Sequence, residues 1–283
     1  MMRRLLLLVC VAVLTWAASP VRAASDLVLV VMDPMALELS CPCVKGYAQR
    51  NYSKLAAHLT KQLGREVKLH FADNLATALK VKTGGRADLV IGKDSVVEAG
   101  AAANKLAISR LVSLTDKQGK TTQTGLWVVA AKDPALSVAD LQGYDLIFGL
   151  ADAAEKHAAA LNLLDDFGIK APAKRNTCGS CSDAARKLLD EHQAGRKAAA
   201  VISSYAQPLL EGCGTIQKGD LRVIGTTAEV PFVTAFVRSD LPAAESAAIK
   251  KALLEVAKDA ALCKLLETKQ GFVGLPAGAA KKK

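Results

Sequence analysis

Aromatic side chains are scarce in this chain, since Trp, Tyr and Phe together make up 4% of its 283 residues. The formal net charge is +10, yet no stripe of Lys and Arg is interleaved with aromatic residues. Proteins that bind nucleic acids commonly combine a cationic surface with aromatic platforms for the bases. Nucleic-acid binding is therefore not expected. Part of the excess positive charge lies at the chain ends, in Arg3, Arg4 and the lysine run 281–283.

The sequence also lacks the short motifs by which several enzyme classes are recognised. It contains no G-x-S-x-G nucleophile turn, no H-E-x-x-H zinc motif and no G-x(4)-G-K-[ST] phosphate loop. No glycine fingerprint for a dinucleotide follows the first predicted strand. The sequence gives no positive indication of catalysis, and we do not expect an enzyme.

One apolar run stands out near the start, "LLLLVCVAVLTWAA", and it is too short to span a bilayer comfortably. Arg3 and Arg4 precede this run, and "VRA" places small residues before a cut after Ala23. Residues 1–23 are therefore predicted to be a secretory signal peptide. Cys10 lies inside the apolar run and not at a lipid-attachment position. We expect an exported, soluble, periplasmic protein without stable membrane insertion.

The remainder of the chain alternates buried strands with amphipathic helices. Continuous apolar runs such as "DLVLVVM" and "ADLVIG" predict buried strands, and helical spacing separates them. The first series covers 26–92 and a second series covers 125–204. Further helices are expected at 153–168 and, as one long stretch, at 242–267. This alternation predicts an α/β fold with parallel strands covered by helices.

Three stretches resemble the periplasmic substrate-binding proteins of ABC transporters, specifically the phosphate/phosphite/phosphonate-binding type. They are "YSKLAAHLTKQLGREVKLHFADNLATALKVKTGGRADLVIG", "TGLWVVAAKDPALSVADLQGYDLIFG" and "SDAARKLLDEHQAGRKAAAVISS". The resemblance implies a two-lobed periplasmic-binding-protein fold (type II-like) with an interlobe cleft. It implies that lobe 1 comprises 26–118 plus 225–276 and that lobe 2 comprises 119–224. Residues 277–283 are expected to be a disordered basic tail.

The same resemblance implies capture of a small ligand, a phosphonate- or phosphate-like oxyanion, for an ABC permease. Members of the family hold the anion with a Ser/Thr-rich loop that precedes a helix. Here that place reads "GLADAAEKHAAAL", with Ala153 and Ala154 in place of hydroxyls and Glu155 and Lys156 beside them. The loops expected at the cleft supply the following ligand-binding candidates: Ser40, Tyr47, Lys93, Asp94, Ser95, Thr122, Thr124, Asp152, His157, Ser203, Ser204 and Tyr205.

Cysteines form two close pairs, Cys41 with Cys43 and Cys178 with Cys181, while Cys213 and Cys263 stand alone. The family layout implies that the two pairs face each other across the cleft. Three interpretations stay open for them. Export favours structural disulfides, four thiolates would suit a zinc or copper site, and a C-x-x-C at a helix start can be a redox dithiol. The alternative function is thus a periplasmic metal-binding or thiol protein on the same fold.

Overall fold

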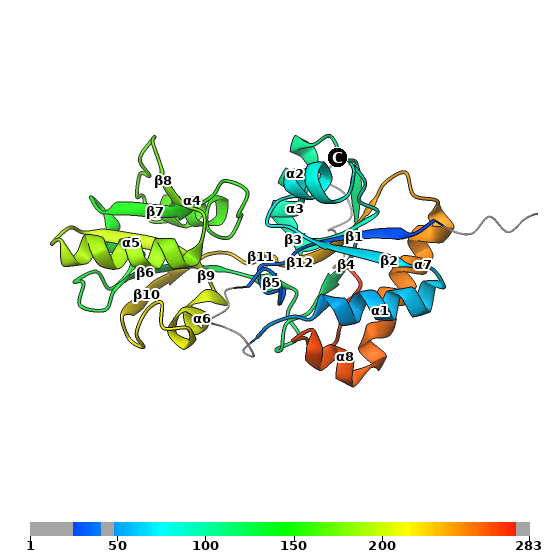
Figure 1. The fold of residues 1–283 in the computed structure, drawn as a ribbon. Coiled ribbons are helices and arrows are strands. Elements are labelled where there is room, and N and C mark those ends of the chain that lie inside the picture. Colours follow the sequence, from blue (N-terminus) through cyan, green and yellow to red (C-terminus); the bar gives the residue numbers. More distant parts are fainter. Residues whose placement is uncertain (1–24, 41–47, 276–283) are drawn as a thin grey trace, which may run out of the picture.

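The computed structural model describes residues 25–40 and 48–275, which form two α/β lobes joined by crossing strands (Figure 1). The two-lobed α/β fold expected from the sequence is confirmed. The predicted signal peptide, the basic tail, Cys41, Cys43 and Tyr47 lie outside the described residues. None of the described helices combines the length and the apolar character needed to cross a membrane.

The first lobe is built on a six-stranded sheet with helices on both faces. Its strands and helices are β1 (Leu27–Met32), α1 (Tyr52–Leu63), β2 (Val67–Phe71), α2 (Leu75–Thr77) followed by a π-helical turn (Ala78–Lys82), β3 (Leu89–Lys93), α3 (Asp94–Ala103), β4 (Ile108–Leu114), β12 (Val233–Arg238), α7 (Ala243–Leu254), a 3-10 turn (Glu255–Lys258), α8 (Ala260–Leu265) and β13 (Phe272–Val273). The strand order is β13-β4-β12-β3-β1-β2. Because β1 pairs in parallel with β2 and β3, their carboxyl ends share one edge, which faces the second lobe.

The second lobe is built on a five-stranded sheet. Its elements are β6 (Gly125–Ala130), a 3-10 turn (Val138–Leu141), β7 (Asp145–Gly149), α4 (Ala158–Asp166), β8 (Asn176–Cys178), α5 (Cys181–Gln193), β9 (Ala198–Ser203), α6 (Ala206–Gly212) and β10 (Leu221–Thr226). The strand order is β10-β6-β9-β7-β8. A short ribbon of β5 (Thr122–Gln123) and β11 (Val230–Pro231) lies between the lobes (Figure 1). The lobe boundaries at 118/119 and 224/225 stay a prediction.

Two helices differ from the sequence-based expectation. The helix expected at 153–168 begins only at Ala158, because residues 150–157 form successive turns that fold back on β7. The long stretch 242–267 is interrupted at Asp259, whose backbone is extended and whose carboxylate accepts a hydrogen bond from Leu262 N at 2.9 Å. Asp is a strong helix N-cap, so Asp259 begins a new helix in spite of the surrounding alanine and leucine.

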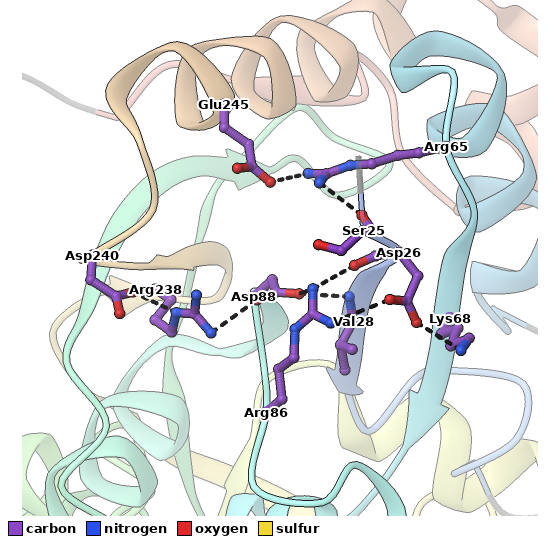
Figure 2. Close-up of polar contacts among 10 residues, drawn as sticks. All are labelled: Ser25, Asp26, Val28, Arg65, Lys68, Arg86, Asp88, Arg238, Asp240 and Glu245. Carbon is purple, nitrogen blue, oxygen red and sulfur yellow. Dashed lines mark hydrogen bonds and ion pairs between the residues drawn. The ribbon is translucent and has the colours of Figure 1, made fainter. Parts of the chain in front are cut away.

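An ionic cluster holds the start of β1 at the end of the first sheet farthest from the other lobe (Figure 2). The buried carboxylate of Asp88 accepts from Val28 N at 2.9 Å and pairs with Arg86 at 2.7 Å and Arg238 at 3.2 Å. Asp26 in turn pairs with Lys68 at 2.7 Å. These contacts satisfy a carboxylate that would otherwise be costly to bury, and they attach the first described residues firmly to the sheet.

A second buried network lies just beyond β1, beneath the cleft. The carboxylate of Asp33 accepts from Arg50 Nη1 at 2.8 Å, from Tyr52 Oη at 2.6 Å and from Met35 N at 3.0 Å. All three side chains that meet here are essentially inaccessible to solvent. Burial, and after it the Asp33 carboxylate, raises the pKa of Tyr52 well above its ordinary value, so this hydroxyl stays a donor. The network fixes the loop after β1 relative to α1.

We expect Asp33→Asn to destabilise the protein by about 3–5 kcal/mol, because it leaves the Arg50 guanidinium buried without its counter-charge. Tyr52→Phe should cost less, about 1.5–3 kcal/mol, since it removes one hydrogen bond from a carboxylate that keeps other donors. Urea unfolding of the two variants and the parent measures both costs. Equal costs for the two variants would show that the charge of Asp33 is not what the network depends on.

Candidate functional site

A cavity of about 580 Å³ lies between the lobes. The first lobe contributes the loop after β1, the end of β3 and the start of α3, and the second contributes the loop after β7, the start of α5 and α6. Its walls are mainly apolar, with a few charged groups, which is the composition of a small-molecule pocket. The residues that line it are Met32, Pro34, Met35, Leu39, Ser40, Ala48, Gln49, Asp73, Lys93, Val96, Leu150, Asp152, Ala153, Lys156, Gly179, Ser180, Cys181, Ser182, Tyr205, Ala206, Leu209, Leu210 and Cys213.

Four of the ligand-binding candidates from the sequence line this cavity: Ser40, Lys93, Asp152 and Tyr205. Cys181, a candidate metal ligand, also lines it. Thr122 and Ser204 instead line, again with Tyr205, a smaller cavity of about 240 Å³ at the crossing strands. The candidates Asp94, Ser95, Thr124, His157 and Ser203 are absent from the linings of both cavities.

Most of the candidates outside the cavities serve the structure around them. Asp94 makes two hydrogen bonds to the Arg110 guanidinium, at 2.8 and 2.6 Å. His157 Nδ1 lies 2.9 Å from the carbonyl oxygen of Gly149, and its ring packs against Phe148. Both side chains therefore have partners within their own lobe, and their role in ligand binding stays a prediction.

A buried ion pair joins the two lobes beside the cavity. Lys93 Nζ, at the end of β3, pairs with Glu155 Oε1 in the loop after β7. Ser203 Oγ, at the end of β9, donates to the same carboxylate oxygen at 2.7 Å. Glu155 is 0% exposed and Lys93 is 7% exposed. Burial alone would raise the pKa of Glu155, but Lys93 and the Ser203 hydroxyl outweigh it and hold that pKa below its ordinary value.

Two glycines position the loop that carries Glu155. A Cβ at Gly125 would lie 2.1 Å from the carbonyl oxygen of Glu155, and a Cβ at Gly149 would lie 2.6 Å from Cβ of Lys156. No other residue permits the loop to approach β6 and β7 this closely. Gly149 N also donates to Lys156 O at 3.1 Å. The carboxylate of Glu155 is thus presented from a closely packed backbone.

A second bridge between the lobes is made by Ser95, in the first turn of α3. Its hydroxyl donates to Asp152 O at 2.6 Å and accepts from Ala154 N at 3.1 Å. Since both partners lie in the loop after β7, Ser95 satisfies backbone groups of the opposite lobe. Ser95 and Lys93 therefore hold the same loop from two points.

The start of α5 contributes a thiol to the cavity. Cys181 is the first residue of this helix, and its Sγ accepts from Ser203 N at 3.4 Å. Lys156 Nζ lies 3.8 Å from the same sulfur. Lys156 is 6% exposed, so a second buried cation borders the cavity.

The cysteines do not form the disulfides considered from the sequence in the part of the chain that is described. Cys178, Cys181, Cys213 and Cys263 are free thiols, although Cys178 and Cys181 lie only three positions apart. Cys178 packs against the core of the second lobe, where burial raises the pKa of its thiol. Within residues 25–40 and 48–275, no cluster of three or more His, Cys, Asp or Glu side chains could hold a metal ion. The described residues therefore lend no support to a zinc or copper site.

Aromatic stacking joins the lobes at the crossing strands. Tyr205 follows β9 in the second lobe and stacks on Phe232, with ring centroids 5.2 Å apart and planes inclined by 22°. The Arg50 guanidinium lies over the same Phe232 ring at 5.3 Å. The floor of the cavity is thereby connected to the buried network at Asp33.

Sequence reasoning did not select Glu155 and Lys156 as site residues, although it noted both. The available signal was a charged pair within an alanine-rich loop directly after a buried strand. Met32, Leu209 and the thiol of Cys213 were also not selected. Their positions in the cavity depend on how the two lobes are set against each other, which no local pattern specifies.

Comparison with known proteins places this geometry in a family. The family model described as "ABC transporter, phosphonate, periplasmic substrate-binding protein" matches residues 46–277. No curated protein sequence matches the chain.

Several solved structures share the fold at low sequence identity. A Xanthomonas citri protein bound to ATP has a TM-score of 0.65 at 18% identity, with 90% of this chain and 92% of that chain covered. PhnD1 from Prochlorococcus marinus in complex with methylphosphonate has a TM-score of 0.65 at 14% identity, covering 89% and 93%. A binding-protein component of an ABC phosphonate transporter from Pseudomonas aeruginosa has a TM-score of 0.65 at 12% identity, covering 88% and 81%. Because the family model matches most of the chain and these folds agree with its two lobes, the chain belongs to the periplasmic phosphonate substrate-binding proteins of ABC transporters.

Proposed function

We propose that the cavity between the lobes is the solute site of this binding protein, and that the two lobes close over the solute before it is passed to an ABC permease. The observation that supports the proposal is that residues of both lobes line the cavity. A solute that touches both walls binds the closed arrangement more tightly than the open one, and so favours closure.

Export of the protein is part of the same proposal. The family is a periplasmic one, and residues 1–23 carry the charge and apolar pattern of a secretory leader. An exported binding protein would meet its solute outside the inner membrane and deliver it to the permease there. The metal or thiol alternative is less favoured, because the described cysteines neither pair nor cluster.

The names of the relatives suggest which solutes to test first. Methylphosphonate is the ligand of the Prochlorococcus protein, so phosphonates and phosphate are the first reference compounds for this cavity. The cavity of about 580 Å³ falls in the range of pockets that hold small organic molecules.

We expect Ser182→Trp to abolish solute capture, because Ser182 lines the cavity at the start of α5 and an indole would fill part of it. The protein is purified from the periplasm of its own source, denatured, and analysed by mass spectrometry for released small molecules. The parent should release a molecule that Ser182→Trp does not. The mass of the parent chain reports in the same experiment whether residues 1–23 have been removed.

Ala247→Trp, on the exposed part of α7, is the matched control and should retain the solute of the parent. If both Trp variants released the same molecule in the same amount, the solute would bind elsewhere and the proposed site would be wrong. An intact Met1 would contradict export.

The ion pair between the lobes predicts a dependence of stability on pH. Because the folded-state pKa of Glu155 lies below its ordinary value of 4.5, its contribution is full above that value and is lost as the pH falls through the lower, folded-state pKa. The melting temperature of the parent should therefore fall more steeply on acidification below pH 4.5 than that of Lys93→Met/Glu155→Gln. Parallel melting curves for the two proteins across this range would contradict the assignment.

A further inference from the structure

We propose that Glu155 sets the specificity of the cleft against dianionic phosphate and phosphonate groups, so that the solute is an organic molecule carrying at most one negative charge. This inference rests on the proposed solute site, and it deepens it by assigning the charge of the solute. The carboxylate of Glu155 pairs with Lys93. It thereby occupies the position beside this cation that the anionic group of a ligand would otherwise take.

The donors beside Lys93 are already in use. Glu155 Oε1 receives both the Lys93 ammonium and the Ser203 hydroxyl, which donates at 2.7 Å. These are the two kinds of donor that a tightly bound oxyanion needs, a cation and an oriented hydroxyl. A phosphate group would have to displace the carboxylate or share its donors. Displacement would leave a buried carboxylate without its counter-charge, which is strongly unfavourable.

The carboxylate cannot easily leave this position. Gly125 and Gly149 let the backbone of the loop pack directly on β6 and β7, and Ser95 binds the same loop from the first lobe. The side chain of Glu155 has no exposed surface. Its second oxygen, Oε2, has no hydrogen-bond partner among the described residues, so the carboxylate has no other site of attachment nearby.

The remaining charges around the cavity do not favour a dianion. Asp73 and Asp152 line the cavity, and neither carboxylate has an ion-pair partner among residues 25–40 and 48–275. Lys156 is the one cation of the lining that makes no close ion pair with a carboxylate of the described residues. Its charge also helps to lower the pKa of Glu155, and its ammonium lies 3.8 Å from Cys181 Sγ. One such cation can accept a single carboxylate or similar group. A dianion would meet more negative than positive charge, and like charges placed close together suppress binding.

The shape of the cavity agrees with an organic solute. Methionine and leucine side chains form much of its wall, with Met32 and Met35 on one side and Leu209 and Leu210 on the other. Methionine adapts to irregular apolar ligands. A small inorganic oxyanion would leave most of this wall without a partner.

The test is isothermal titration of methylphosphonate and of inorganic phosphate into the parent and three variants, at an alkaline pH at which both compounds are mainly dianions. Glu155→Ser removes the charge and makes room beside Lys93, and it should bind methylphosphonate at least about tenfold more tightly than the parent. Glu155→Gln removes the charge but keeps the bulk, so its gain should be smaller. Lys93→Met/Glu155→Ser should bind methylphosphonate no more tightly than the parent, because the cation that would hold the dianion is gone.

Circular dichroism and melting curves establish that each variant is folded before titration. If Glu155→Ser does not fold, the test uses Glu155→Gln instead. The inference is then overturned if Glu155→Gln binds methylphosphonate no more tightly than the parent. The inference is also overturned if folded Glu155→Ser shows no gain, or if the parent binds methylphosphonate as tightly as that variant. Tight binding by the parent that Ser182→Trp abolishes would support the proposed solute site while refuting the role of Glu155, so the two failures are distinguishable.

Discussion

The arrangement of this protein depends on one buried ion pair, between Lys93 of the first lobe and Glu155 of the second. Each group is nearly inaccessible to solvent, so each would be costly to bury alone. Their pairing requires that the end of β3 and the loop after β7 meet. That meeting also brings Ser95 onto the same loop and sets the walls of the cavity. The geometry of the proposed solute site follows from this constraint more than from any feature of either lobe separately.

The pair also explains the unusual chemistry of the loop after β7. A loop that holds an oxyanion is expected to offer hydroxyls and backbone donors, whereas here it offers a carboxylate and a lysine. Ser203 and Lys93, which could both serve an anionic ligand, are turned to Glu155. The first lobe contributes its own internal network at Asp33, which reaches the cavity floor through Arg50, Phe232 and Tyr205. Charged side chains that pair with each other therefore lie on both sides of the cleft.

The fold could be predicted from the sequence because its strands are continuous apolar runs and its helices are separated by clear breaks. Local rules failed where tertiary contacts decide: the loop around Glu155 continues a helical pattern in sequence, but packing on Gly125 and Gly149 keeps it in turns. The site was predicted in part. Lys93 and Asp152, selected because they lie at or just after the end of a strand, line the cavity, and their contact with a solute stays a prediction. The position of Cys181 near Lys156 depends on two segments that meet only in the fold.

The most direct test of this account is small-angle X-ray scattering of the solute-free parent and of Lys93→Met/Glu155→Gln. The double substitution removes both charges while keeping similar side-chain volumes, so neither buried group is left unpaired. If the ion pair holds the lobes together, the parent should have a smaller radius of gyration than the variant, and solute binding should compact the variant more than the parent. Identical radii for the two solute-free proteins would contradict the account.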